Sequence, residues 1–224
     1  MGNPKLVFVG SSAGGVLASL LRHAFVRDLI YEVVSDRACG FLEHARACGL
    51  RATMLESPDG LSFSDALYQR YSEENLLFFS FYTRLFRGRF LERFKNRIFN
   101  CHPSLLPAFT GMRAFGDTLA SSATFMGMTI HLVDEGMDSG QIVLQAALPL
   151  DRSLPLSENN HRLYLCKYYG TLQVLRWLAC QRLAPHALGQ WHLDGARYAP
   201  AIFSPNLDSD FFTYIDENDE FGSD

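Results

Sequence analysis

Three polar residues of this sequence have side chains suited to the transfer of an acyl group to an amine: Asn100, His102 and Asp138. An amide and an imidazole can each donate a hydrogen bond to the oxyanion that forms when an amine attacks a carbonyl carbon. A carboxylate can orient the imidazole and accept or relay the proton that the amine loses. Together these groups could catalyse the transfer without a covalent enzyme intermediate.

Asn100 and His102 stand at the carboxyl end of a predicted strand, immediately before Pro103. Because side chains alternate along a strand, these two point to one face and Cys101 points to the other. We therefore do not expect Cys101 to act as a nucleophile, and interpret it as a small buried residue. Pro103 and Pro107 predict a stiff, non-helical segment that holds His102 at the tip of the strand.

Asp138 lies in the segment from Asp134 to Gly140, between two strand-like runs. The glycines of this segment let its backbone approach a ligand closely. Such a loop could bring Asp138 to the Asn100 and His102 pair, although segments of this composition are also common as solvated turns.

The elements that must position these residues follow an alternating pattern. Strands are predicted over residues 5–10, 30–34, 51–55, 75–82 and 97–102, with a helix after the glycine-rich turn 10–15 and helices over 37–48 and 61–71. Alternation of this kind predicts an α/β fold with a doubly wound, mostly parallel sheet and a Rossmann-type N-terminal half. Runs over 128–133 and 141–150 predict added C-terminal strands, partly antiparallel. A long amphipathic helix, marked by Leu165 to Ala179, is predicted after them.

The same reading predicts one catalytic domain over residues 1–203 and an acidic C-terminal tail over 204–224. The tail is expected to be loosely held, with Phe211, Phe212 and Tyr214 available to dock it.

Composition excludes several function classes. The net charge of −4 predicts no basic surface for nucleic acid. The sequence contains no run of eighteen apolar residues, so no membrane span is predicted. Its first residues do not have the pattern of a secretory signal, so a cytoplasmic protein is expected. The five cysteines form no CxxC pair, which favours reduced thiols and no metal site.

The run Asn100-Cys101-His102-Pro103-Ser104-Leu105-Leu106-Pro107, followed by Asp138-Ser139-Gly140-Gln141-Ile142, resembles the 10-formyltetrahydrofolate-dependent formyltransferases. The glycinamide ribonucleotide transformylase branch is the most similar, and the resemblance extends over about residues 5–178, including His131. It implies a formyltransferase-like fold, 10-formyltetrahydrofolate as co-substrate, and a small-molecule amine as acceptor. It also implies that Asn100, His102 and Asp138 are catalytic, in a monomer or homodimer.

The resemblance further implies a slot for the pterin between residues 82–86 and 133–138. Its expected contacts are Arg84, Leu85, Val133 and Asp134, with backbone groups making most hydrogen bonds. Without the resemblance, residues 82–86 would be interpreted as an ordinary strand exit.

The acceptor side departs from the family pattern. The loop at the first helix is usually G-x-G-[ST]-N, whereas here it runs Gly10-Ser11-Ser12-Ala13-Gly14-Gly15. Arg113 stands where the family often has a His-x-His pair, and Lys167 stands where it has a glutamate. Either cation would suit a carboxylate or phosphate, although both also fit a solvated surface. The expected acceptor contacts are Ser11, Ser12, Ala13, Gly14, Arg113 and Lys167.

These departures favour an unchanged donor and a different acceptor, a specialised amine such as N5-hydroxyornithine or an amino sugar, with glycinamide ribonucleotide still open. Two alternatives are a formyltetrahydrofolate hydrolase, which directs water to the formyl carbon, and a non-catalytic folate- or nucleotide-binding module. The hydrolases carry an N-terminal regulatory domain, whereas this chain opens on its first predicted strand. A binding module has no need of the catalytic trio.

Overall fold

The computed structural model describes residues 4–186, 189–199 and 202–217. Within them one eight-stranded sheet has the order β10-β7-β6-β5-β4-β1-β2-β3. Its strands are β1 (Leu6–Gly10), β2 (Ile30–Ser35), β3 (Ala52–Met54), β4 (Leu77–Phe81), β5 (Ile98–His102), β6 (Phe125–Leu132), β7 (Ile142–Pro149) and β10 (Phe203–Ser204). Strands β1 to β5 pair in parallel, and β6, β7 and β10 join antiparallel. The predicted doubly wound, mostly parallel sheet with added C-terminal strands is confirmed.

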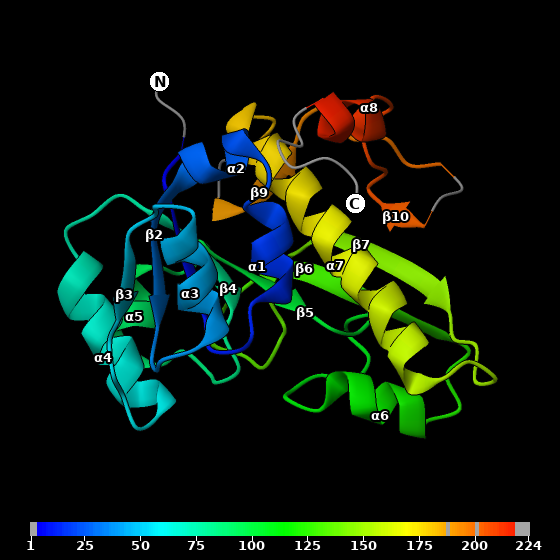
Figure 1. The fold of residues 1–224 in the computed structure, drawn as a ribbon, viewed down its shortest axis with the longest axis horizontal. Helices are drawn as coiled ribbons and strands as arrows, with labels where there is room; N and C mark the ends of the chain where they lie inside the picture. The colour runs from blue at the N-terminus through cyan, green and yellow to red at the C-terminus, as the bar shows by residue number, and fades with distance from the viewer. Residues whose placement is uncertain (1–3, 187–188, 200–201, 218–224) are drawn as a thin grey trace.

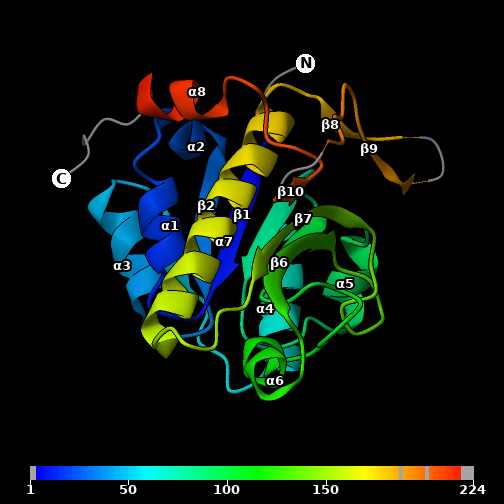
Figure 2. The same ribbon diagram turned by 90° about the vertical axis from the view of Figure 1, so that its right-hand side faces the viewer.

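Helices cover both faces of this sheet (Figure 1 and Figure 2). One face packs against α1 (Gly15–Leu20), α2 (Ala24–Leu29), α3 (Gly40–Ala47) and the long α7 (Leu156–Ala179). The other packs against α4 (Gly60–Tyr71) and α5 (Gly88–Arg93). A further helix, α6 (Ala114–Ala120), follows the strand β5 and its exit segment.

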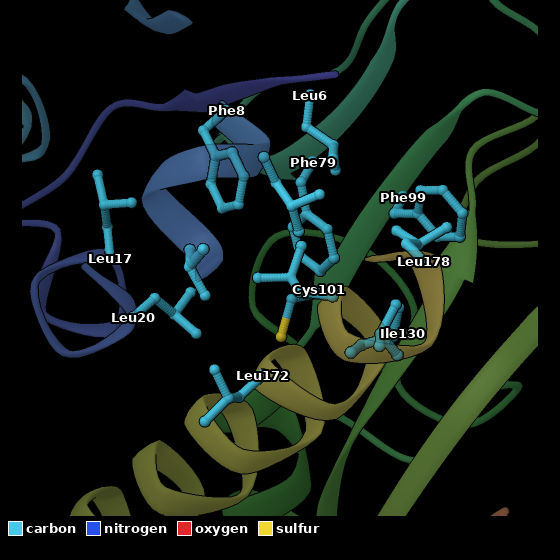
Figure 3. Close-up of a cluster of buried hydrophobic side chains, with 14 of the residues drawn as sticks. Leu6, Phe8, Leu17, Leu20, Phe79, Phe99, Cys101, Ile130, Leu172 and Leu178 are labelled. Atoms are coloured by element: carbon cyan, nitrogen blue, oxygen red, sulfur yellow. The ribbon is translucent and has the colours of Figure 1, made fainter. Parts of the chain in front are cut away.

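Alternate residues of the central strands divide between the two cores. Leu6 and Phe8 of β1 face the α7 side, whereas Val7 and Val9 face the α4 and α5 side. Because both faces are covered, the strands read as continuous apolar runs rather than as an alternating pattern. Figure 3 shows the core on the α7 side, where Phe8 and Phe79 lie between the sheet and helices of that layer.

A buried carboxylate joins β2, β3 and α4 away from the cavity described below. Glu32 accepts hydrogen bonds from Thr53 Oγ1 at 2.5 Å, Arg70 Nη2 at 2.6 Å and the Tyr71 hydroxyl at 2.6 Å. Burial would raise the pKa of Glu32, but these hydrogen bonds and the arginine charge outweigh it and lower the pKa below 4.5. The ionised carboxylate therefore stabilises the fold.

The structure divides one predicted helix. The apolar residues after the glycine-rich turn predict a single helix, but the chain leaves helical geometry at His23, which has φ −95° and ψ 121°. His23 is buried, and its Nε2 lies 2.7 Å from the Tyr168 hydroxyl of α7. The short helices α5 and α6 were not predicted, because fewer than two full turns show no clear 3.6-residue period.

The C-terminal residues form more structure than a loosely held tail. Strands β8 (Leu183–Pro185) and β9 (Trp191–Leu193), which precede the predicted tail, form a hairpin. At the start of the tail β10 pairs with β7, and further on α8 (Phe211–Glu217) packs Phe211 against Tyr169 of α7. Asp208 accepts hydrogen bonds from Arg182 and from Trp177 of α7. Residues 218–224 of the predicted tail lie outside the described residues, and the domain boundary at 203 stays a prediction.

In the described part of the chain, no helix has both the length and the apolar character that a bilayer crossing requires.

Candidate active site

Asn100 and His102 lie on the sheet face that carries α4 and α5, and Cys101 lies on the α7 face. Ile98, two residues before Asn100, belongs to the core under α4 and α5. Cys101 belongs to the opposite core, and Figure 3 shows its sulfur directed toward α7, which carries Leu172. The predicted alternation of these side chains is therefore found.

His131 of β6 fixes the orientation of the Asn100 amide. The antiparallel pairing places Asn100 opposite His131, and Asn100 Nδ2 lies 3.1 Å from His131 Nε2. His131 Nδ1 lies 2.8 Å from the carbonyl oxygen of Leu132, which can only accept, so Nδ1 carries a proton. Burial lowers the pKa of His131 below 6.5, which favours the neutral ring. Nε2 then accepts from the amide, and the second amide N–H remains available to a ligand.

Asp138 closes the site from the loop between β6 and β7. Its Oδ2 accepts a hydrogen bond from the backbone N–H of Gly111 at 2.7 Å and lies 3.5 Å from His102 Nδ1. Its Oδ1 lies 3.6 Å from His131 Nε2. The side chain of Asp138 is 13% exposed, and its backbone has φ +54°, a region that aspartate tolerates better than most residues.

His102 presents one ring nitrogen to Asp138 and the other to the backbone. Its Nε2 lies 2.9 Å from the carbonyl oxygen of Phe109, so Nε2 donates there. Ser104 Oγ donates to the same carbonyl at 3.0 Å and to that of Ala108 at 2.7 Å. Nδ1 is therefore the nitrogen through which Asp138 can orient and charge-stabilise the ring.

The segment that carries these carbonyls is held by a residue that sequence reasoning missed. Thr129 Oγ1 donates to the carbonyl oxygen of Ser104 at 2.7 Å and accepts from the N–H of Leu106 at 3.1 Å. Gln145 Nε2 donates to the same hydroxyl at 3.0 Å and to the Leu106 carbonyl at 2.9 Å. The pairing of His102 with Thr129 places this hydroxyl beside the site, but it depends on the register of β5 and β6, which no local pattern reveals.

A cavity of about 900 Å³ opens at these residues. It is lined by the ends of β4 and β5, the loops after β1 and β6, and one face of α7. Because both Asn100 and Cys101 line it, the cavity wraps around the carboxyl end of β5. That edge of an open α/β sheet is where ligands bind, and the volume suits a drug-sized ligand.

All four predicted folate contacts line this cavity: Arg84, Leu85, Val133 and Asp134. The guanidinium of Arg84 also forms an ion pair with the buried Asp36, with Nη1 2.9 Å from Oδ2. Burial would raise the pKa of Asp36, but hydrogen bonds from Arg37 and Tyr82 and the charges of both arginines lower it. Asp36 is thus an ionised partner for Arg84.

The predicted acceptor contacts divide into two groups. Ser12, Ala13, Gly14 and Lys167 line the cavity. Ser11 and Arg113 are not among its lining residues, contrary to expectation. The hydroxyl of Ser11 lies 2.8 Å from that of Thr83. The side chain of Arg113 is 86% exposed and lies 3.7 Å from Asp117, one turn along α6.

The glycines around the first loop serve helix packing. Gly14 has φ +78°, and a Cβ there would lie 2.7 Å from Phe41 Cα of α3. A Cβ on Gly40 would lie 2.5 Å from the carbonyl oxygen of Ala13. The glycines let α3 approach the loop closely, so their presence does not by itself indicate a phosphate cradle.

No group of three His, Cys, Asp or Glu side chains within residues 4–186, 189–199 and 202–217 is arranged to hold a metal ion. A metal-free reaction stays a prediction.

Comparisons with known proteins agree with this geometry. The family model described as "Formyl transferase" matches residues 60–174. The phosphoribosylglycinamide formyltransferase of Mycobacterium tuberculosis (strain CDC 1551 / Oshkosh) is 34% identical over 154 residues, 65% of this chain and 71% of that protein. The chloroplastic phosphoribosylglycinamide formyltransferase of Vigna unguiculata is 30% identical over 189 residues, 80% of this chain and 59% of that protein.

Among solved structures, glycinamide ribonucleotide transformylase 1 from Symbiobacterium toebii superposes with a TM-score of 0.75 at 31% identity, covering 85% of this chain and 94% of that one. The phosphoribosylglycinamide formyltransferase of Coxiella burnetii gives a TM-score of 0.74 at 26% identity, covering 86% and 94%. The family match spans half of the chain and the fold match most of it, so the chain belongs to the formyl transferase family and is a folate-dependent formyltransferase.

Proposed function

We propose that this enzyme transfers the formyl group of 10-formyltetrahydrofolate directly to the amine of a small-molecule acceptor, with Asn100, His102 and Asp138 as its reaction centre. The observation that supports this most is the approach of Asp138 to His102, 3.5 Å apart on the wall of one cavity. The two residues come from segments on either side of β6, and Asn100 lies on the same strand face as His102.

In the proposed reaction the two donors stabilise the oxyanion. Asn100 uses the amide N–H that His131 leaves available, and His102 uses Nδ1 when that nitrogen is protonated. Because Gly111 and Phe109 hold Asp138 and His102 by their backbones, both groups are positioned before the substrates bind.

In the proposed reaction Asp138 accepts the proton that the acceptor amine loses. As the acceptor nitrogen bonds to the formyl carbon, it loses a proton to Asp138, directly or through water. The bond from the formyl carbon to folate nitrogen then breaks, and the proton passes to that nitrogen as tetrahydrofolate leaves. No covalent bond to the protein forms, so Cys101 has no part in the reaction.

We propose glycinamide ribonucleotide as the first acceptor to test, because the relatives' names specify this activity. A specialised amine, such as N5-hydroxyornithine or an amino sugar, is the second candidate. It is favoured by Lys167 in the cavity wall and by the altered loop at residues 10–15.

The test offers 10-formyltetrahydrofolate with each acceptor in parallel and follows tetrahydrofolate by absorbance. Release that depends on one acceptor supports the proposal and identifies the substrate. Release at an equal rate with no acceptor would instead indicate the hydrolase.

The Asp138→Asn variant tests the reaction centre. Asparagine tolerates positive φ and its carbonyl can accept from Gly111, so the fold should be retained while kcat falls about 10²- to 10⁴-fold. Asp117→Asn on α6 is the matched control and should leave kcat unchanged. Near-full turnover by Asp138→Asn would refute the assignment.

A further inference from the structure

Lys167 is a cation on the cavity wall. It lies on α7 and is half-buried. Within the described residues it makes no ion pair and no hydrogen bond to a carboxylate, carbonyl or hydroxyl through its side chain. Arg84, which lines the same cavity, is paired with Asp36 at 2.9 Å. A half-buried ammonium without a protein counter-ion is free to pair with an anion that enters the cavity.

The surroundings of Lys167 place it on the part of the cavity wall that faces the first loop. Tyr164, one turn earlier on α7, also lines the cavity, and its ring lies 3.7 Å from the Cβ position of Gly15, the first residue of α1 after the first loop. Burial raises the pKa of Cys101, while the nearby charge of Lys167 acts to lower it. Lys167 therefore lies near both the first loop and the strand that carries Asn100.

Carboxylates on the loop after β6 are already engaged. Asp134 accepts from Ser139 Oγ at 2.8 Å, and Glu135 lies 3.1 Å from Lys95. Asp138, on the same loop, accepts from the Gly111 N–H. The charge of the cavity is thus divided, with acidic groups on the β6 loop, Arg84 and Arg87 on the segment after β4, and the Lys167 ammonium on α7.

We propose that Lys167 binds an anionic group of the formyl acceptor, a carboxylate or a phosphate, and thereby selects which amines are formylated. The inference rests on the proposed function. Gly10 and Gly14 of the first loop pack closely against Phe41 of α3, and on the α7 side of the cavity Lys167 would supply positive charge for such an acceptor.

The first test compares Lys167→Met, which keeps the length of the side chain, with wild type. The KM for the anionic acceptor should rise about 10- to 100-fold, the effect of one charge-assisted hydrogen bond, while the KM for the folate donor stays within about twofold. Lys167→Arg should recover most of the loss. Lys5→Met, at the start of β1, is the matched control, because the Lys5 ammonium donates to the Asp28 carbonyl and should not affect either KM.

Paired acceptors then identify the anion. N5-hydroxyornithine is compared with the same amine lacking its carboxylate, and glycinamide ribonucleotide with its dephosphorylated form. Wild type should prefer the anionic member of one pair, and Lys167→Met should lose that preference. An unchanged preference in Lys167→Met, or an equal loss on charged and uncharged acceptors, would overturn the inference.

A second measurement needs no turnover, so it separates this inference from the proposed function. The chain has three lysines, Lys5, Lys95 and Lys167, and ¹³C-methylation gives each an NMR signal while keeping its charge. Inorganic phosphate or acetate should shift the Lys167 signal, assigned by its loss in Lys167→Met, and leave the other two in place. A Lys167 signal that neither anion moves would overturn the inference even if every acceptor on the panel failed.

Discussion

Replacing Thr129 by valine should destabilise the segment that holds His102. Valine has nearly the shape of threonine but lacks the hydroxyl, which here makes three hydrogen bonds in a fully buried position. The change leaves the Leu106 N–H and the Ser104 carbonyl without that partner. Gln145 keeps its bond to the Leu106 carbonyl at 2.9 Å.

The magnitude follows from the two buried backbone groups. Each costs about 1–3 kcal/mol when left unsatisfied, and the added methyl group returns about 0.8 kcal/mol. The free energy of unfolding should therefore fall by about 1–5 kcal/mol, with about 3 kcal/mol as the central value. A protein of this size should lose about 2–4 °C in Tm for each kcal/mol. Thr129→Ser keeps the hydroxyl and loses one methyl group, so about 1 kcal/mol is expected.

Guanidinium chloride unfolding of wild type, Thr129→Val and Thr129→Ser measures these differences. The slope m should not change, because the surface exposed on unfolding is the same. The Phe109 carbonyl that holds His102 is on the same segment, so kcat should fall in the valine variant more than the KM for the folate changes. A valine variant within about 0.5 kcal/mol of wild type, or more stable than the serine variant, would refute the reasoning.

Four further outcomes are expected. Gly127→Ala should lower the free energy of unfolding by about 1–3 kcal/mol, because its Cβ would lie 2.1 Å from the carbonyl oxygen of Ala146. Gly116→Ala, whose Cβ meets nothing within 4 Å in α6, should instead raise it by up to about 1 kcal/mol, and thermal unfolding distinguishes the two. Cys101→Ala should cost about 0.5–1.5 kcal/mol in denaturant unfolding and leave kcat nearly unchanged, whereas loss of turnover without loss of stability would restore a chemical role for the thiol. Burial would raise the pKa of Glu32, but hydrogen bonds hold it below 4.5 in the folded protein. The contribution of the ionised carboxylate to the free energy of unfolding is therefore complete above about pH 4.5 and is lost as the pH falls through the folded pKa. Unfolding midpoints should accordingly fall less steeply from pH 5 to pH 3 in Glu32→Gln than in wild type.

The parts of the fold that could be predicted from the sequence depend on long apolar runs and on the alternation of side chains along a strand. Strand β5 was predicted with its ends nearly correct, and the opposite orientation of Cys101 relative to Asn100 and His102 follows from the two-residue period alone. The break between α1 and α2 could not be predicted, because it depends on contact between His23 and Tyr168, which are 145 residues apart.

Much of the site depends on partners that the chain brings together only after folding. The hydrogen bond from Gly111 to Asp138 joins two loops, and the ion pair of Arg84 with Asp36 joins two strand ends. Neither pair has a regular spacing that could indicate contact. Arg113 was expected at the cavity because it stands where the resembled family often has a His-x-His pair, but α6 begins there and the Arg113 side chain is exposed to solvent.

The alternation along β5 also limits how genes for this protein can diverge. Deletion or insertion of a single codon before Asn100 would shift the strand by one residue and reverse the face of every side chain after it. Cys101 would then take the face that now carries Asn100 and His102, and an amide and an imidazole would be placed in an apolar core without partners. Substitutions in this strand can be tested by selection one at a time, whereas changes of length would remove the catalytic residues and the core in one step.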